Sequence, residues 1–227
     1  VMLAYAPLHY LMLEDRGPLV MTSGNISDEP IVKDNAEARE RLAGLADAFL
    51  MHNRDIETRC DDSVMRVFEG RDLPVRRSRG YAPFPVALPF DLPPVLAAGG
   101  ELKATFCLAR GRHAFVSQHI GDMENLETLR AFEQAVQRFT DLFGYRPEAL
   151  VCDLHPRYLG TRWALAQAAG RPCLQVQHHH AHIAAVSAEH GLSPDEPLIG
   201  LSFDGTGFGT DGAIWGGEVL IADQRRF

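Results

Sequence analysis

The sequence contains no Cys-x-x-Cys pair, and its four cysteines lie far apart, at positions 60, 107, 152 and 173. A zinc ribbon needs paired thiolates, so this spacing excludes one within the chain and fits reduced thiols in a cytoplasmic protein. The longest apolar runs have only the length of strands, which predicts no membrane span. Residues 1–13 lack the basic start and the cleavage site of a secretory signal, and the first residue is valine rather than methionine.

Positive charge is also scarce. The chain has 22 lysine and arginine residues against 30 aspartate and glutamate residues, so its formal net charge is −8. A general nucleic-acid binder presents a basic face that displaces counterions from the phosphate backbone. We therefore expect no nucleic-acid partner, although a local basic pocket can still hold a small anionic substrate. The 227 residues are enough for one large domain or two modest ones.

The first 81 residues have the pattern of a small α/β unit. A short β-prone run at 19–22 ends in turn residues, and Asp34, with glutamate three residues later, predicts a helix that continues to about residue 49. Alternating polar and apolar side chains over 63–79 predict a hairpin. Residues 81–94 then contain five prolines. Since proline does not continue a helix or a central strand, we expect a domain linker at 82–94.

After the prolines the expected elements follow a regular order. Strands are expected at 95–98, 105–109, 114–119, 149–152 and 174–177, helices over 126–143, 158–169 and 178–189, and two further strands at 197–203 and 214–222. The order βββαβαβα is that of a ribonuclease-H-like half, and the last strands would begin a second half. Actin-like ATPases are built from two such halves, so the sequence predicts an α/β fold of that type.

Residues 178–182 read His-His-His-Ala-His, and His178 and His182 are four positions apart. On a helix this spacing places both imidazoles on one face, where they can bind one metal ion. Histidines can also cap a helix or point into solvent, but four within five residues favour the metal site. Asp204 is the nearest carboxylate for a third ligand, and such nitrogen and oxygen donors suit iron or zinc. No glutamate lies between the histidines, which argues against a zincin protease.

A glycine-rich stretch covers residues 204–212, between two expected strands. Glycines let backbone N–H groups approach an anion, and the Thr206 hydroxyl can add a donor, so Gly205, Thr206 and Gly207 form a candidate phosphate loop. Asp204 at its start could hold a magnesium ion that bridges phosphates. An ordinary glycine-rich hairpin is the alternative. No helix with a lysine follows, so the stretch is not a Walker loop.

Two further groups could bind an anion. Thr22, Ser23 and Asn25 offer two hydroxyls and an amide at a sharp turn, where they could hold a phosphate or a carbonyl. Arg77 lies in a basic cluster with arginines at 76 and 79, at the end of the expected hairpin, and could contact phosphate. A purely structural turn and a solvated strand edge are the respective alternatives.

Eight short segments occur in an order that is similar to one known family. They are 21–30 (MTSGNISDEP), 61–64 (DDSV), 77–83 (RSRGYAP), 101–103 (ELK), 118–122 (QHIGD), 153–156 (DLHP), 176–182 (VQHHHAH) and 203–207 (FDGTG). Over essentially its whole length the chain resembles the HypF-type carbamoyltransferases of NiFe-hydrogenase maturation. The resemblance implies that residues 1–81 are the C-terminal part of a YrdC-like adenylate-forming domain and 82–94 the linker. It implies that 95–195 are the first half of a TsaD-like actin-type domain and 196–227 the start of its second half.

The resemblance also implies a cytoplasmic enzyme and its chemistry. Such enzymes use ATP, with Mg²⁺, and carbamoyl phosphate to form carbamoyl-adenylate, and pass the carbamoyl group to the C-terminal cysteine of the partner HypE. HypE then dehydrates the carbamoyl thioester to a thiocyanate, which supplies the cyanide ligand of the hydrogenase iron. By this resemblance Ser23, Asn25 and Arg77 belong to the adenylate site, His178 and His182 to the metal site, and Asp204 with Gly205 and Gly207 to the nucleotide and metal cleft.

Several of the family's modules are not in these 227 residues. The acylphosphatase-like domain, the zinc modules, the first part of the YrdC-like domain and the rest of the actin-like second half are absent. We therefore expect the chain to be an incomplete fragment that does not catalyse the full reaction alone. Two alternatives stay open: an enzyme of the tRNA threonylcarbamoyladenosine type, and a remnant without catalytic activity.

Overall fold

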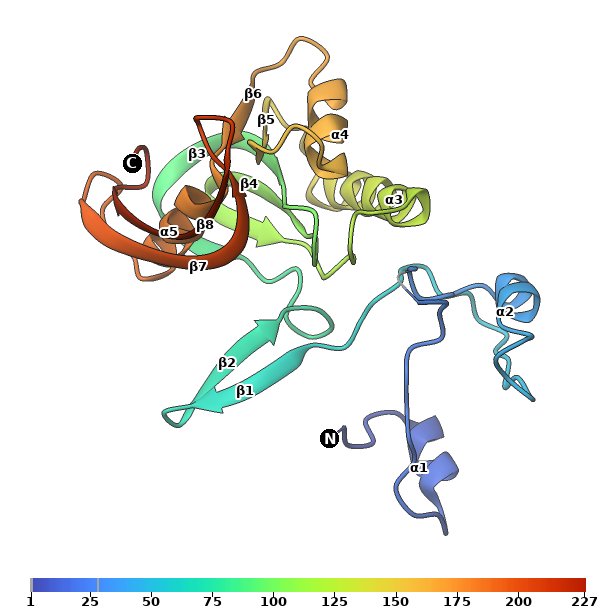
Figure 1. The fold of residues 1–227 in the computed structure, drawn as a ribbon. Coiled ribbons are helices and arrows are strands. Elements are labelled where there is room, and N and C mark those ends of the chain that lie inside the picture. The colour runs from blue at the N-terminus through green and yellow to red at the C-terminus, as the bar shows by residue number, and fades with distance from the viewer. Residues whose placement is uncertain (1, 28) are drawn as a thin grey trace.

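The computed structural model describes residues 2–27 and 29–227 (Figure 1). One body holds a four-stranded sheet and the three longest helices, and the N-terminal segments lie below it in this view. Those N-terminal segments form helices α1 (Pro7–Leu13) and α2 (Asn35–Arg41) and the hairpin of β1 (Val64–Phe68) and β2 (Arg71–Arg76). In the described part of the chain, no helix is both long and apolar enough to cross a bilayer.

Helix α2 begins where the sequence predicts and ends earlier. The Asp34 carboxylate accepts hydrogen bonds from the backbone N–H groups of Ala36 and Glu37, which caps the first turn. The helix stops at Arg41 rather than near residue 49, because Gly44 soon follows and glycine costs a helix about 1 kcal/mol relative to alanine. Residues 19–22 form no strand, since no described segment pairs with them.

The predicted hairpin is present. In the β1–β2 pair, Phe68 lies opposite Arg71, and the two turn residues between them, Glu69 and Gly70, both have positive φ values, of 50° and 74°. Two consecutive residues with positive φ fit the right-handed twist of paired strands, which is why this turn connects them tightly.

The central sheet has the strand order β4-β3-β5-β6. Its strands are β3 (Val86–Ala98), β4 (Phe106–Val116), β5 (Ala149–Asp153) and β6 (Cys173–Val176). Strand β4 is antiparallel to β3, whereas β3, β5 and β6 run parallel to one another. The mixed α/β class predicted from the sequence is thus confirmed in this body.

The proline-rich segment differs from the expectation. Strand β3 begins at Val86, so it includes Pro89, Pro93 and Pro94, where a linker without strand structure was expected. The register to β4 shifts twice between residues 87 and 95, and only residues 95–97 also pair with β5. Prolines are tolerated at such bulges and on a strand side without a partner, because no ladder hydrogen bond is lost there.

The element order differs from the expectation by one strand. The segments 105–109 and 114–119, expected as two strands, form the single strand β4. Gly111 between them has a φ of 57° and lies opposite Leu92, at a register shift, so it bends the strand without ending it. A glycine inside a continuous strand can accommodate such a bulge, which the sequence pattern presents as a turn.

Two helices cover one face of the sheet and enclose the core. Helices α3 (Leu126–Phe143) and α4 (Leu159–Gln167) pack their apolar sides on strands β3, β4 and β5. The fully buried Phe106 of β4 lies edge-on against Phe132 and Phe139 of α3, at ring centroid distances of 5.5 and 4.9 Å. Burial of these aromatic side chains is the main stabilising contribution of this face.

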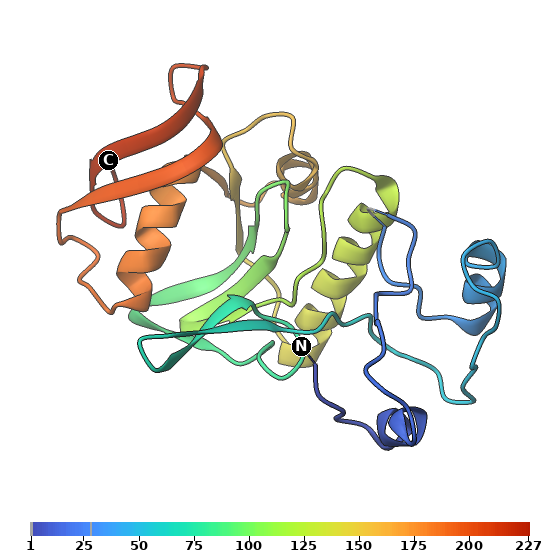
Figure 2. The same cartoon turned by 60° about the horizontal axis from the view of Figure 1, so that its bottom comes forward.

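A third helix and a hairpin complete the body. Helix α5 (His178–Glu189) contacts β3 and also the hairpin of β7 (Leu198–Phe208) and β8 (Ile214–Ala222). Figure 2 shows α5 between this hairpin and the sheet. Helix α5 and strand β8 have the predicted bounds, and β7 continues five residues beyond its predicted end at 203.

Candidate metal and nucleotide site

The start of α5 presents two histidines on one face. Gln177 caps the helix, because its side-chain oxygen accepts a hydrogen bond from the backbone N–H of His180 at 2.9 Å. His178 and His182, one turn apart, have their Nε2 atoms 3.2 Å apart. The four-residue spacing in the sequence therefore produces the predicted pair of converging imidazoles.

Asp204 reaches the same point from β7. The pairing of β7 with β8 shifts register between Phe203 and Gly207, so residues 204–206 bulge from the strand. The Asp204 Oδ2 atom lies 2.9 Å from Nε2 of His178 and 3.2 Å from Nε2 of His182. The bulge thus directs the Asp204 carboxylate at both imidazoles, as expected if the three side chains bind one metal ion.

These three side chains fit a metal ion. Their donor atoms all lie within 4.8 Å of one another. Ligands about 2.0–2.1 Å from a tetrahedral zinc ion are separated from each other by roughly 3.3 Å, close to the 2.9–3.2 Å spacing here. Two imidazole nitrogens and one carboxylate oxygen suit zinc or iron.

A second carboxylate contacts the other ring nitrogen of His178, Nδ1. Asp153, at the end of β5, has its Oδ2 atom 2.6 Å from Nδ1 of His178. This hydrogen bond, followed by the charges of Asp153 and Asp204, outweighs burial and raises the pKa of His178. Burial alone would raise the pKa of Asp204, but hydrogen bonds from His182, His178 and the backbone of Gly205 lower it. The site therefore holds Asp204 as a carboxylate.

Three further histidines at or near α5 lie outside the cluster. His179 is buried, with Nδ1 3.2 Å from the side-chain nitrogen of Gln177, and burial lowers its pKa. His180 has Nε2 2.8 Å from the backbone oxygen of Asp223. His190 ends α5 and is not part of the cluster. Only the first and last histidines of the stretch 178–182 therefore face the candidate metal site.

The glycines of the predicted phosphate loop differ in their surroundings. A Cβ at Gly205 would meet no atom within 4 Å, and Gly205 and Thr206 are exposed beside Asp204. Gly207 is buried, and a Cβ there would lie 2.7 Å from Nδ1 of His179. The first glycine leaves space for a ligand, whereas the packing of His179 requires the second.

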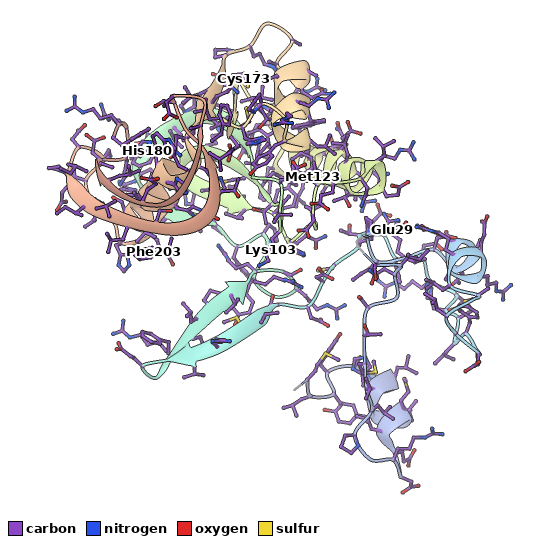
Figure 3. All side chains as sticks on the ribbon, viewed as in Figure 1. Glu29, Lys103, Met123, Cys173, His180 and Phe203 are labelled. Carbon is purple, nitrogen blue, oxygen red and sulfur yellow. The ribbon has the colours of Figure 1, made fainter. Side chains whose placement is uncertain are left out.

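The predicted Ser23 and Asn25 line a cavity of about 330 Å³ between the N-terminal segments and the body. The cavity is also lined by Arg59 and by residues of the body, among them Lys103 and His119. In Figure 3, Lys103 lies on the side of the body that faces the N-terminal segments. Lys103 and His119 belong to two of the segments that carry the family resemblance, and the structure places both in one cavity with Ser23.

Side-chain contacts connect the N-terminal segments to the body beside the cavity. Arg138 of α3 donates to the backbone oxygen of Glu57 and to the hydroxyl of Thr58, and its guanidinium pairs with the Glu57 carboxylate at 2.9 Å. Gln118 donates to the backbone oxygen of Arg59. The cavity walls are thus fixed by contacts between the two parts of the chain.

Two of the predicted anion-binding residues lie elsewhere. Arg77 donates to the backbone oxygens of Tyr81 and Phe84 and does not line the cavity. Thr22 is exposed and does not line it either. The neighbouring Arg76 and Arg59 line the cavity instead. Arg76 is the last residue of β2, whereas Arg77 follows the strand and contacts the loop at residues 81–84 instead of the cavity.

Asn25 shapes the turn as well as lining the cavity. Its side-chain nitrogen donates to the backbone oxygens of Ile26 and Glu29, at 2.9 and 3.0 Å. Ser23 is exposed, so its hydroxyl is the freer of the two groups for a ligand. A substitution at Ser23 therefore tests ligand binding with less disturbance of the turn.

We expect protonation of His119 at acidic pH to weaken the packing of the N-terminal segments against the body. Burial, assisted by the charge of Arg76, lowers the pKa of His119, so the folded chain favours the neutral imidazole. This contribution to stability is present above the ordinary histidine pKa of about 6.5, and it is lost as the pH falls through the lowered folded pKa. Thermal unfolding midpoints of the chain and of His119→Gln, compared from about pH 7 to about pH 5, should converge or cross as the pH falls. A difference that does not change with pH would contradict this assignment.

Comparisons with known proteins cover most of the chain. Residues 91–189 match the family described as the HypF Kae1-like domain, and residues 200–227 match the second subdomain of the carbamoyltransferase Kae1-like domain. Residues 1–78 match the Sua5/YciO/YrdC family, described as telomere recombination.

Among curated proteins, the chain is 48 % identical to carbamoyltransferase HypF2 of Cupriavidus necator over 98 % of its length. It is 45 % identical to carbamoyltransferase HypF of Rhizobium leguminosarum over its whole length. The chain spans about 30 % of the length of each of these relatives.

Solved structures of HypF proteins also match most of the chain. A crystal structure of full-length HypF in a phosphate- and nucleotide-bound form matches 98 % of the chain with a TM-score of 0.91 at 49 % identity. The structure of HypF from T. kodakarensis matches 88 % with a TM-score of 0.80 at 43 % identity. The chain covers 35 % and 26 % of these structures, respectively.

Proposed function

The chain belongs to the HypF carbamoyltransferase family, and we propose that it supplies two sites of an enzyme that uses ATP and carbamoyl phosphate to form carbamoyl-adenylate. The enzyme would then transfer the carbamoyl group to the C-terminal cysteine of HypE, for the cyanide ligand of a hydrogenase. The observation that carries the proposal is the match of 98 % of the chain, with a TM-score of 0.91, to HypF in a phosphate- and nucleotide-bound form.

The proposal divides the chain at the boundaries expected from its sequence. Residues 1–81 would be the C-terminal part of the adenylate-forming domain and 82–94 its connection to the next. Residues 95–195 and 196–227 would belong to the two halves of the actin-type domain. The match to the YrdC family ends at residue 78 and the match to the HypF Kae1-like domain begins at residue 91, which supports this division.

The cavity beside Ser23 would be the adenylate site. Its lining residues include the cationic Arg59, Arg76 and Lys103, whose charged groups could stabilise the negative charge of phosphate oxygens. The Ser23 hydroxyl can donate to the same oxygens, while Asn25 keeps the turn in place. Arg77, proposed for this site from the sequence, would act indirectly by bracing the chain at residues 81–84.

His178, His182 and Asp204 would hold one zinc or iron ion beside the exposed Gly205 and Thr206. Such an ion supplies positive charge next to the phosphates of a nucleotide. The chain's own groups contribute the rest: the Gly205 backbone leaves room for a phosphate, and the Thr206 hydroxyl can donate to it. We propose Mg²⁺ as the companion of ATP, with Asp204 as the nearest carboxylate of this cleft.

The cavity between the two parts of the chain would also protect the intermediate. Carbamoyl-adenylate is a mixed anhydride that water hydrolyses, so a site closed by a second module preserves it until transfer. His119 and Gln118, which come from the second module, form part of that wall. This arrangement supports a single enzyme that both activates and transfers the carbamoyl group.

The test is release of AMP and pyrophosphate from ATP. The chain would replace the matching segment of its Cupriavidus necator relative, and turnover would be measured with and without carbamoyl phosphate. We expect carbamoyl-phosphate-dependent turnover that Ser23→Ala reduces about 10- to 100-fold, since one hydroxyl donor to a charged group is worth about 1.5–3 kcal/mol.

The matched control is Ser193→Ala, a serine outside the cavity and the metal cluster. Turnover that requires threonine and bicarbonate instead of carbamoyl phosphate would assign the chain to the tRNA-modification branch. We expect no full turnover from the 227 residues alone, and activity of that chain by itself would contradict the fragment interpretation.

A further inference from the structure

Asp153 is a buried carboxylate whose two oxygens have separate partners. Its side chain lies at the end of β5, and the residue is only 8 % exposed. Oδ1 accepts a hydrogen bond from the backbone N–H of His155 at 2.8 Å, and Oδ2 lies 2.6 Å from Nδ1 of His178. One oxygen therefore shapes the loop that follows β5, and the other contacts a proposed metal ligand.

The contact with Asp153 decides which nitrogen of His178 carries the proton. A neutral imidazole has one N–H, and a carboxylate can only accept a hydrogen bond. The short distance between Oδ2 and Nδ1 therefore places the proton on Nδ1. Nε2 faces the carboxylate of Asp204 at 2.9 Å and Nε2 of His182 at 3.2 Å, so without a metal ion the ring can donate to both carboxylates. When a metal ion takes the lone pair of Nε2, Asp153 holds the one remaining proton on Nδ1. A metal ion binds only a nitrogen that is not protonated.

We infer that Asp153 is a positioning residue that fixes the tautomer and the ring orientation of His178, so that Nε2 can bind a metal ion. This inference rests on the metal site of the proposed function. Carboxylates behind metal-bound histidines commonly have this role, and their loss costs about 10- to 100-fold in metal affinity. The backbone oxygen of Asp153 also accepts a hydrogen bond from the Thr161 hydroxyl of α4, at 3.1 Å, which keeps the end of β5 in place.

Two substitutions separate this role from a structural one. In Asp153→Asn the amide oxygen can still accept from the His155 N–H, but the amide nitrogen then faces His178 as a donor. Nδ1 must become the acceptor, which places the proton on Nε2 and blocks the metal-binding atom. Asp153→Ala removes both contacts and leaves the His178 tautomer free.

The two roles predict opposite orders of metal affinity. With Asp153 as the tautomer-fixing residue, Co²⁺ titrations of the full chain should give the wild type the highest affinity. Asp153→Ala should be about 10- to 100-fold weaker and Asp153→Asn weaker still. With a merely structural role, Asp153→Asn should bind more tightly than Asp153→Ala, because it keeps the side-chain volume and the His155 contact. Asp141→Asn, on the exposed face of α3, is the control for the loss of one negative charge.

A second readout does not depend on metal. At alkaline pH, nitrogen–proton correlation spectra of the His178 side chain report which nitrogen is protonated. We expect Nδ1–H in the wild type and Nε2–H in Asp153→Asn. The same tautomer in both proteins, or equal Co²⁺ affinity of the wild type and Asp153→Asn, would overturn the inference. A wild-type chain with the expected tautomer but without Co²⁺ binding would refute the metal site and leave the role of Asp153 in orienting His178 intact.

Discussion

Replacement of His178 by alanine is expected to reduce metal affinity by two to three orders of magnitude. Four-ligand zinc sites have apparent binding free energies of about 10–16 kcal/mol, or about 3–4 kcal/mol for each ligand, which corresponds to about 10²- to 10³-fold. The Nε2 atom of His178 contacts both Asp204 and His182, and His178 is the cluster histidine that Asp153 also contacts. Isothermal titration with Zn²⁺ or Co²⁺ measures the loss directly.

The matched control is His190→Ala. His190 lies at the end of the same helix and is exposed, but it is outside the cluster. It should leave the affinity unchanged within about twofold, since a substitution at an exposed residue outside the site removes no ligand. Equal losses in the two variants would show that the metal binds histidines of α5 without regard to the cluster geometry.

The second large effect is expected at Gly207. A Cβ there would lie 2.7 Å from Nδ1 and 3.0 Å from Nε2 of the buried His179 ring, so Gly207→Ala must displace either the ring or strand β7. Overpacking of this kind costs about 1–3 kcal/mol of unfolding free energy. Chemical denaturation of the chain should show this loss as a lower denaturant midpoint.

Gly205→Ala is the internal comparison for that measurement. A Cβ at Gly205 meets no atom within 4 Å, so the substitution should change stability by no more than about 0.5 kcal/mol. Gly205 lies in the bulge and Gly207 is the first paired residue after it, so comparing the two substitutions separates the effect of packing on His179 from the effect of losing a glycine in this segment. Equal destabilisation by both substitutions would contradict the role assigned to His179.

Periodicity and spacing in the sequence were sufficient to predict that His178 and His182 converge, whereas metal binding at this point stays a prediction. The four-residue separation of His178 and His182 requires only that the segment be helical, and the bounds of α5 agree with the prediction. Asp204 was proposed as the nearest carboxylate in the sequence, although the bulge that directs it at the imidazoles depends on pairing with β8. Local pattern was thus enough where the chemistry depends on one helix and one strand end.

Features that depend on pairing between distant segments were not accessible. Whether Pro89 ends or continues a strand depends on the register of β3 against β4, and Gly111 poses the same question in the partner strand. Which of Arg76 and Arg77 lines the cavity depends on how the end of β2 and the loop after it lie beside the body. Asp153 was visible as an acidic residue after a strand, but its contact with His178 requires β5 and α5 to meet.

The contacts from Asp153 through His178 to Asp204 also form a mechanical connection. Three elements meet in this row: β5 of the central sheet, the first turn of α5, and the bulge of β7. A rotation of the β7–β8 hairpin against the sheet must either break the 2.6 and 2.9 Å contacts or move the end of β5 with it. The row therefore couples the β7–β8 hairpin to the central sheet, so that the hairpin and the end of β5 move together for as long as these two contacts hold.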